Sequence, residues 1–213
     1  MLIELKNISP RYLEQEKIEG SEVWEQGLVF TKPDIVEIVA SSGRGKSSLI
    51  NFIYGTKSDF KGSIMIDNIA VEKQSAEFLT SLRTKKLSVV FQDLRLFETR
   101  TCLENILVKR ALAPFAQEDT IMHMADSLGV RNKLGSTAGN CSYGERQRIA
   151  IIRALQQPFD FILLDEPFSH LDDRNRDLAL KLILEEASKR KAGIILADLE
   201  TNKNFPATKR IRL

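Results

Sequence analysis

The sequence has few cysteines and no long apolar run. Its 213 residues include two cysteines, two histidines and one tryptophan. Two cysteines form no disulfide framework of the kind that holds small secreted domains together, which favours a reducing cytoplasm. Apolar runs such as FILL and GIILA are far shorter than the ~20 residues of a membrane-spanning helix. The start, MLIELKNISP, lacks a signal-peptide core. We therefore expect any membrane association to depend on a partner.

The chain also lacks a strong charge of either sign. It carries 31 Lys and Arg residues against 29 Asp and Glu residues, a formal net charge of +2. A charge this small gives no argument for binding to nucleic acid or anionic lipid. Hydrophobic residues make up 43% of the chain and charged residues 28%, which is ordinary for a globular protein with a sizeable core. The length fits one domain that carries an inserted subdomain.

Two kinds of apolar pattern predict two kinds of sheet. Apolar and polar residues alternate in the N-terminal third, which is typical of antiparallel strands with one buried face. Uniformly apolar runs follow, separated by helical patterns, and these predict a parallel sheet buried on both faces. The alternating segments are 2–8, 23–30 and 62–68, and the apolar runs are 35–40, 87–91, 161–164 and 193–197. A helix is expected at 173–191 and a short final strand at 209–213.

Residues 95–139 differ from the rest of the chain. They contain the helical patterns LENILVKRALA and DTIMHMADSLGV and no strand signal. We interpret this segment as a helical insertion. The predicted organisation is a single domain, 1–213, in which 1–94 and 140–213 form the catalytic core with its β subdomain.

A glycine-bearing loop, ASSGRGKSS at 40–48, lies between a predicted strand and a predicted helix. Its glycines let successive N–H groups point inward at phosphate oxygens, and the helix N-terminus attracts the same anion. Ala40 replaces the first glycine of the usual pattern, which should tighten the loop slightly. The alternative is an ordinary turn carrying a solvated lysine. The residues expected to bind nucleotide are Ser42, Gly43, Arg44, Gly45, Lys46, Ser47 and Ser48, with Lys46 on the β- and γ-phosphates and the Ser47 hydroxyl on Mg²⁺.

Two adjacent carboxylates, Asp165 and Glu166, follow the buried run at 161–164. Open α/β sheets bind ligands at this carboxyl end of their strands. Asp165 suits the water-rich shell of Mg²⁺, and Glu166 suits a base that takes a proton from an attacking water. The alternative is a polar strand end that only solvates two carboxylates. The phosphate loop in the same chain favours hydrolysis of a phosphoanhydride.

In their order along the chain, these motifs resemble those of ABC-type ATPases, the nucleotide-binding subunits of ATP-binding-cassette systems. ASSGRGKSS resembles the Walker A loop, VVFQD the Q-loop, CSYGERQ the signature motif, LLDEP the Walker B motif and SHLD the D-loop. The resemblance covers nearly the whole chain. It implies an α/β P-loop NTPase (RecA-like) core with an antiparallel β subdomain and an inserted helical subdomain. It also implies that Tyr12 stacks on adenine and that Gln92 contacts Mg²⁺ and the attacking water.

The resemblance implies an assembly as well. Two copies would sandwich two ATP·Mg²⁺, with Ser142 and Gly144 of one copy contacting the γ-phosphate held by the other. Ser142 and Glu145 also form a capping box, so helix capping and the signature role coincide. The text FQDLRLFETRTCLENI resembles the FtsE/LolD/MacB group of short ATPases that bind membrane subunits. This implies an integral membrane permease that docks near residues 94–97 and holds the protein at the inner face of the membrane.

Several residues depart from the family pattern. Tyr143 replaces a glycine of the signature motif, Cys141 a leucine and Glu145 a glutamine, which predicts weaker closure over ATP. Asp198 stands where the family has a histidine that contacts the γ-phosphate. His123 and His170 lie elsewhere in the pattern, in the helical insertion and the D-loop. Because a carboxylate is repelled by phosphate, we expect turnover to fall by ~10²–10³ relative to an intact site.

Two functions compete at this point. The leading one is a Mg²⁺-dependent ATPase in which Glu166, Lys46 and Gln92 are catalytic and Ser47, Gln92 and Asp165 bind the metal. The alternative is an ATP-binding dimerisation switch with little hydrolysis, which the departures at Asp198, Tyr143 and Ala40 favour. A DNA-repair or chromosome-organising protein would carry long coiled-coil insertions, and no sustained heptad pattern is present. A small-molecule kinase would need no signature helix.

Overall fold

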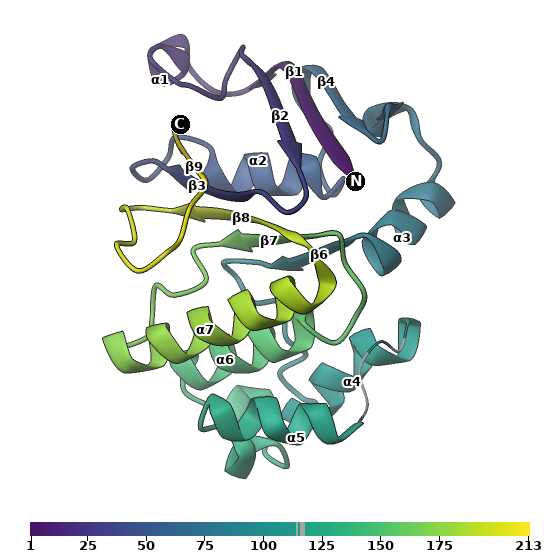
Figure 1. The fold of residues 1–213 in the computed structure, drawn as a ribbon, viewed down its shortest axis with the longest axis vertical. Helices are drawn as coiled ribbons and strands as arrows, with labels where there is room; N and C mark the ends of the chain where they lie inside the picture. The colour runs from purple at the N-terminus through teal and green to yellow at the C-terminus, as the bar shows by residue number, and fades with distance from the viewer. Residues whose placement is uncertain (114, 116–117) are drawn as a thin grey trace.

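The structure, a computed structural model, describes residues 1–113, 115 and 118–213 (Figure 1). From top to bottom, Figure 1 shows the antiparallel sheet, helix α2 (Lys46–Ile53), the parallel sheet and a group of helices. This is the α/β architecture that the motifs predict, with a β subdomain above the core and helices below it. No helix in the described part of the chain is both long and apolar enough to span a bilayer.

The antiparallel sheet has the strand order β2-β1-β4-β5. Ile3 and Leu5 on β1, one of the two inner strands, are buried, while Glu4 between them is partly exposed, so the alternation in the sequence marks the buried face. The strands are β1 (Leu2–Pro10), β2 (Gly27–Thr31), β4 (Phe60–Ile66) and β5 (Ile69–Ala70).

The strand predicted at 23–30 is wrong in its first half. The Ser21 hydroxyl accepts hydrogen bonds from the N–H groups of Val23 (3.0 Å) and Trp24 (2.9 Å), which closes a turn. Glu25 then has φ +61°, a left-handed conformation that ends any extended run. The turn buries Trp24, which is 1% exposed, on the inner side of the β subdomain.

The parallel sheet has the order β6-β7-β8-β3-β9 and every pairing in it is parallel. Adjacent residues of β7 face opposite cores: Phe161 packs with α2 and the antiparallel sheet, and Ile162 packs with the lower helices. The prediction of a sheet buried on both faces is therefore confirmed. The strands are β3 (Ile35–Val39), β6 (Leu87–Val90), β7 (Phe161–Asp165), β8 (Gly193–Asp198) and β9 (Lys209–Arg212).

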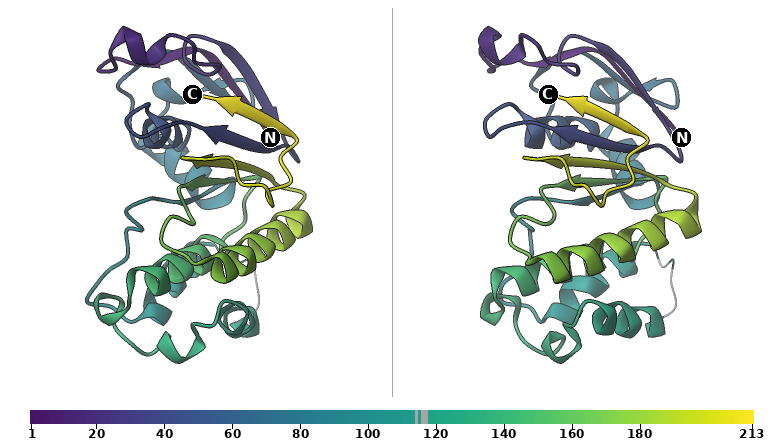
Figure 2. Two further views of the ribbon diagram at one scale, coloured as in Figure 1. Left: turned by 90° about the vertical axis from the view of Figure 1, so that its left-hand side faces the viewer. Right: turned by 60° about the vertical axis from the view of Figure 1, so that its left-hand side comes forward.

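Helices cover both faces of the parallel sheet. Figure 2 shows α7 lying along the lower face and β9 beside β3 at the edge. The short α1 (Gln15–Ile18) lies in the β subdomain, and Gly55, with φ +72°, ends α2 as predicted. The other α-helices are α2 (Lys46–Ile53), α3 (Ala76–Lys85), α4 (Cys102–Leu112), α5 (Glu118–Ser127), α6 (Tyr143–Ala154) and α7 (Asp173–Arg190); 3-10 turns occupy Val71–Lys73, Arg131–Lys133 and Ala138–Asn140.

The predicted insertion, 95–139, contains α4 and α5 where the two helical patterns were identified. Thr101 caps α4, and its hydroxyl and the Glu104 carboxylate form a complete capping box. An isolated bridge joins Thr101 to Thr137, so the two ends of this segment lie side by side. Residues 114, 116 and 117 of the segment lie outside the described residues, and its exact boundaries stay a prediction.

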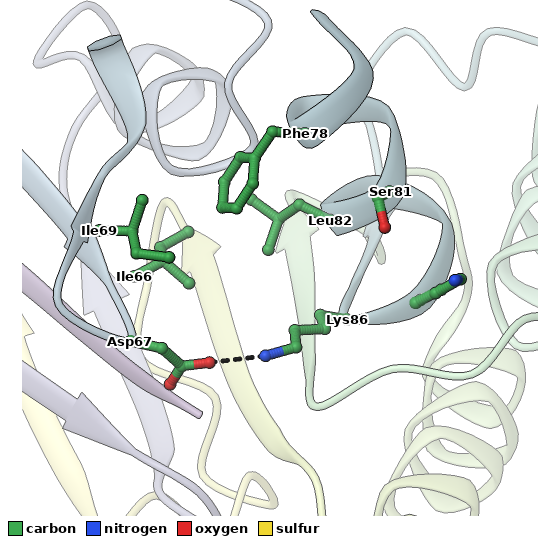
Figure 3. Close-up of a pocket in the computed structure, with 8 residues that line it drawn as sticks. Ile66, Asp67, Ile69, Phe78, Ser81, Leu82 and Lys86 are labelled. Atoms are coloured by element: carbon green, nitrogen blue, oxygen red, sulfur yellow. Dashed lines mark hydrogen bonds and ion pairs between the residues drawn. The ribbon is translucent and has the colours of Figure 1, made fainter. Parts of the chain in front are cut away.

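A small apolar pocket of about 130 Å³ lies between α3 and the β4–β5 hairpin (Figure 3). Asp67 closes one side of it, because its carboxylate lies 2.7 Å from the Lys86 ammonium and accepts the Leu2 N–H (2.9 Å). These contacts tie the start of β1 to the end of α3. The other side chains around it are Ile66, Ile69, Phe78, Ser81, Leu82 and Lys85.

A buried carboxylate lies at the edge of the parallel sheet. Glu37 on β3 is 0% exposed, and its oxygens accept the Arg210 guanidinium on β9 (2.7 Å) and the Asn202 N–H (2.7 Å). A buried charge is tolerated only when it is paired in this way. The pair therefore fixes the edge strand β9 and the loop before it against β3.

We predict that Arg210→Leu lowers the free energy of unfolding by about 2 kcal/mol, because it leaves the Glu37 charge buried without its ionic partner. Arg212→Leu, at an exposed position on the same strand, should change it by at most about 0.5 kcal/mol. The double variant Glu37→Gln with Arg210→Leu should recover part of the loss. Urea denaturation measures all three, and equal effects of the two arginine variants would show that the pair is unimportant.

Candidate functional site

The candidate site lies where β3 ends and α2 begins, at the carboxyl edge of the parallel sheet. Gly43 has φ +79° and Gly45 has φ +98°, so both adopt left-handed conformations that other residues rarely accept. A Cβ on Gly45 would lie 2.8 Å from the Trp24 ring. Glycine is therefore required at position 45 both by the backbone and by the close approach of the indole.

Lys46 is held inside this loop. Its ammonium donates to the carbonyl oxygens of Ala40 (2.7 Å) and Ser41 (3.2 Å) and lies 3.2 Å from Glu166 Oε1. The residue is 4% exposed. The alternative of a turn with a solvated lysine is therefore wrong, because the charge is buried and surrounded by three oxygens.

Trp24 supports the loop from the β subdomain, a contact that sequence reasoning missed. Its indole N–H donates to the Arg44 carbonyl (3.1 Å), and the Arg44 guanidinium donates to the Lys17 carbonyl (3.1 Å). The signal in the sequence was Ser21, whose hydroxyl makes a turn out of an apparently alternating strand. The Arg44 side chain thus points toward α1, and only the Arg44 backbone forms part of the loop.

The two carboxylates after β7 have different surroundings. Asp165 is 2% exposed, and its Oδ1 has no hydrogen-bond partner among the described residues. Burial raises the pKa of Asp165 to about 6, and the neighbouring Glu166 charge adds to the rise. Glu166 has φ +46°, and its Oε2 accepts the Gln92 side-chain amide (3.1 Å). The strained Glu166 backbone is typical of functional positions.

Ser47, Gln92 and Asp165 offer the oxygen atoms that Mg²⁺ prefers. The Ser47 hydroxyl donates to Gln92 Oε1 at 3.4 Å, so these two groups already lie together. The unpartnered Asp165 oxygen is a buried acceptor that a cation would satisfy. The donor set therefore fits a hydrated magnesium ion.

Most of the predicted nucleotide-binding residues surround one open depression of about 280 Å³. The Tyr12 hydroxyl is hydrogen-bonded to the Ser48 hydroxyl at its rim, and Tyr12 is 55% exposed, which leaves its ring free for stacking. Arg44, Asp165, Ser142 and Gly144 are not among the lining residues. The depression is lined by Tyr12, Leu13, Ser42, Gly43, Gly45, Lys46, Ser47, Ser48, Gln92 and Glu166.

The start of α6 has the predicted capping box. The Ser142 hydroxyl accepts the Glu145 N–H (3.3 Å), and the Glu145 carboxylate accepts the Ser142 N–H (2.8 Å). The Glu145 carboxylate also lies 3.2 Å from the Lys133 ammonium. These interactions lower the pKa of Glu145, the hydrogen bond to Ser142 most strongly among them. Lys133 therefore offsets the negative charge that Glu145 brings where the family has a glutamine.

The Tyr143 side chain packs against other residues of its own chain. Its hydroxyl donates to the Gln92 backbone carbonyl (2.8 Å), and its ring meets the His170 ring edge-on with centroids 4.2 Å apart. Gln147, one turn later, donates to the Glu166 carbonyl (3.3 Å) and accepts the His170 N–H (3.3 Å). Helix α6 is thereby connected to the segments of Gln92, Glu166 and His170.

Asp198, at the end of β8, lines a separate depression with Ser169 and Arg176. Burial raises the pKa of its carboxyl, and the Glu166 charge acts in the same direction. Its Oδ1 accepts the Leu199 N–H (2.7 Å). His123 is exposed on α5, the His170 ring lies against Tyr143, and neither histidine lines the depression at Asp198.

The predicted docking segment, 94–97, is only partly available at the surface. Leu94 is 3% exposed, whereas Phe97 is 55% exposed and its backbone is held by the Asn105 side chain (2.8 and 3.0 Å). The docking prediction thus applies to Phe97 and not to Leu94.

Lys109, on α4, is a partly buried cation. Burial, together with the charges of Arg153 and Arg83, lowers its pKa to about 8.

Comparison with known proteins gives a consistent result. Residues 27–169 match the family model described as ABC transporter. The lipoprotein-releasing system ATP-binding protein LolD of Legionella pneumophila is 31% identical over 79% of this chain and 76% of its own length. LolD of Rickettsia conorii is 31% identical over 90% and 86%. The methionine import ATP-binding protein MetN of Carboxydothermus hydrogenoformans is 29% identical over 86% of this chain and 55% of its own length.

Solved structures show the same fold. A dimeric bacterial ABC transporter cassette matches with a TM-score of 0.78 and 24% identity, over 93% of this chain and 88% of that one. An ATP-binding protein of a proposed ABC transporter from Pyrococcus furiosus matches with a TM-score of 0.79 and 19% identity, over 100% and 98%. At these identities the likeness concerns the fold.

We predict that Gly45→Ala weakens binding of ATP and ADP by about tenfold or more, because strain at φ +98° and the clash with Trp24 cost about 1–3 kcal/mol. Gly135→Ala is the matched control, since a Cβ there meets nothing within 4 Å. Isothermal titration calorimetry with magnesium measures the affinities. Equal affinities of the two variants would show that the loop geometry does not hold the nucleotide.

We also predict that Lys109→Met stabilises the protein at pH 7 by about 2 kcal/mol. The folded-state pKa is lowered to about 8 from 10.5, so the unfolded chain holds the proton more strongly. The free-energy cost of burying the Lys109 charge is full below pH 8 and disappears as the pH rises toward 10.5. The stabilisation by Lys109→Met should therefore shrink over the same range. Denaturation at pH 7 and pH 10 tests this. Lys181→Met, at a position 74% exposed, is the control, and a gain that does not change with pH would contradict the prediction.

Proposed function

Because the chain belongs to the ABC transporter family of ATP-binding proteins, we propose that it is a Mg²⁺-dependent ATPase that drives a membrane partner. Two copies would close over two molecules of ATP and hydrolyse them slowly. The observation that carries this proposal is the convergence of Lys46, Gln92 and Glu166 on one depression, with Lys46 3.2 Å and Gln92 3.1 Å from the Glu166 carboxylate.

Nucleotide binding would use the backbone of the loop first. The N–H groups of residues 43–48 and the N-terminus of α2 surround the phosphate tail. Lys46 would turn from the carbonyls of Ala40 and Ser41 to the β- and γ-phosphates, which offer more negative charge. Tyr12 lies beside Ser48 at the rim, where an adenine ring can stack on it.

Ser47, Gln92 and Asp165 are the residues that would hold Mg²⁺. The ion supplies neutralisation of the phosphate charge during transfer. Asp165 contributes a buried oxygen that no described group satisfies. The raised pKa of Asp165 would fall again once a cation faces it.

Glu166 is the base in this proposal. Lys46 now occupies one of its oxygens and the Gln92 amide occupies the other. When Lys46 moves to the phosphates, Oε1 becomes available to accept a proton from the attacking water. Gln92 then holds the carboxylate in position through Oε2, which is the geometry that general base catalysis requires.

Turnover is proposed to be slow because of Asp198. A carboxylate near the end of β8 cannot donate a hydrogen bond to the γ-phosphate while it is ionised, and its charge repels that phosphate. The nearby Glu166 charge adds to the negative potential. Both histidines of the chain lie elsewhere, at positions 123 and 170.

Closure of two copies would use the start of α6. Ser142 is exposed there, and the helix N-terminus carries the partial positive charge that attracts a phosphate. Gly144 packs closely on the His170 carbonyl, which a Cβ would meet at 3.0 Å, and Tyr143 is turned toward Gln92 instead of toward the solvent. One structural relative is described as a dimeric cassette, which supports the same arrangement here.

The partner in this proposal is an integral membrane permease subunit. LolD and MetN are named for lipoprotein release and methionine import, both of which involve membrane transport. The exposed Phe97 ring is the proposed contact, and the protein would lie peripherally on the cytoplasmic face of the membrane. A second function, an ATP-dependent dimerisation switch with little hydrolysis, is favoured by Asp198, Tyr143 and Ala40.

We predict that Glu166→Gln lowers steady-state phosphate release by about 10²-fold, because the base is lost while the shape is kept. Asp198→His should raise it by about 10- to 10²-fold, because an imidazole can donate to the γ-phosphate. Calorimetry should show unchanged ATP affinity within a few-fold. If wild type and Glu166→Gln are equally inert while both bind ATP, the switch function replaces the ATPase. No gain from Asp198→His would refute the role given to position 198.

A further inference from the structure

The two cysteines of the chain meet in the lower core. Cys102 begins α4 and Cys141 directly precedes Ser142, the N-cap of α6. Their sulfur atoms lie 3.5 Å apart, although the residues are 39 positions apart in the sequence. Both thiols are free, and the residues are 0% and 6% exposed. The pair therefore lies where α4 and α6 begin, and these two helices pack against each other (Figure 1).

Backbone hydrogen bonds hold the two sulfur atoms in place. The Cys102 N–H donates to Ser136 O (2.9 Å) and the Cys141 N–H to Ala138 O (3.2 Å). The Ala138 N–H donates to Arg100 O (2.9 Å), beside the bridge between Thr101 and Thr137. The two segments that carry the cysteines are therefore fixed to each other. A disulfide bond is about 2.05 Å long, so the sulfurs need to approach by about 1.5 Å to form one.

We propose that Cys102 and Cys141 are an oxidisable pair that a peroxide converts into an intramolecular disulfide, which joins the start of α6 to the start of α4. Hydrogen peroxide accepts the two electrons. The Cys141 sulfur attacks one peroxide oxygen, which breaks the O–O bond, forms a sulfenic acid and releases water with the thiol proton. The Cys102 sulfur then attacks the Cys141 sulfur, and the hydroxyl group leaves as a second water with the Cys102 proton.

The surroundings of the two thiols decide which of them reacts with the peroxide first. Cys141 is the more accessible of the pair, so a peroxide reaches its sulfur first. Burial raises the pKa of the Cys102 thiol to about 12, with a further rise from the contact with Cys141. Cys102 therefore stays protonated until Cys141 has reacted, and it acts as the resolving thiol. Because both groups are buried, the reaction is slow.

The disulfide would act on the signature helix, a consequence that rests on the proposed function. Ser142 follows Cys141 directly, so a movement of Cys141 toward α4 displaces the N-terminus of α6. The contact proposed for that N-terminus lies across a dimer interface and requires close positioning. A displacement of about 1 Å at such a contact lowers rates by up to about 10²-fold.

The experiment treats the purified protein with hydrogen peroxide and counts thiols in denaturant with Ellman's reagent, alongside intact mass and a non-reducing peptide map. The expected result is loss of both thiols together, loss of two hydrogens in mass and one Cys102–Cys141 linked peptide, all reversed by dithiothreitol. Cys102→Ser is the control, and in it Cys141 should be oxidised to sulfenic or sulfinic acid with no linked peptide. Sulfinic acid on Cys141 of the wild type with Cys102 still free, or two intact thiols after prolonged treatment, would overturn the proposal.

The functional consequence is measured separately. Phosphate release by the oxidised wild type should fall about tenfold or more and return with dithiothreitol, whereas Cys102→Ser, kept reduced before a brief exposure, should lose much less. If the protein releases no phosphate at all, the thiol count and the peptide map still decide whether the pair exists. Failure of the proposed ATPase and failure of this inference are therefore distinguishable.

Discussion

The site depends on the contacts of the buried Lys46 ammonium with three oxygen atoms. A cation with 4% exposure is stable only because Ala40, Ser41 and Glu166 surround it with oxygen. These three groups come from the end of β3 and the end of β7, so one charge fixes the distance between the phosphate loop and the acidic pair. An incoming polyphosphate competes with a carboxylate for the same ammonium. In the proposed mechanism, nucleotide binding and release of the Glu166 carboxylate are therefore parts of one exchange of partners.

Much of the fold could be predicted from the sequence because its two sheets differ in how they are buried. Runs such as FILL are apolar throughout because both faces of the parallel sheet are covered, and the capping box at Ser142 is a local pattern. The turn at 23–26 could not be predicted, since VWEQ alternates like a strand and only the Ser21 hydroxyl ends the extended conformation. The burial of Leu94 also escaped prediction, because it depends on contacts between distant segments.

For the candidate site, the residue types could be chosen from the sequence, whereas the directions of their side chains came from the structure. Gly43, Gly45 and Lys46 form a local pattern whose geometry follows from the backbone. Tyr143 shows the limit of such reasoning: the substitution is visible in the sequence, but its hydroxyl finds the Gln92 carbonyl 51 residues away. With Gln147 on Glu166 and His170, this bond ties the start of α6 to the segments that carry Gln92 and Glu166.

The indole beneath the phosphate loop has a practical meaning. Trp24 is the single tryptophan of the chain, and its N–H is bonded to the loop at the Arg44 carbonyl. Its emission under ultraviolet light therefore arises from one place, in contact with Gly45. The protein carries its own optical reporter at the point where a ligand would first disturb the backbone, and no dye or label has to be introduced.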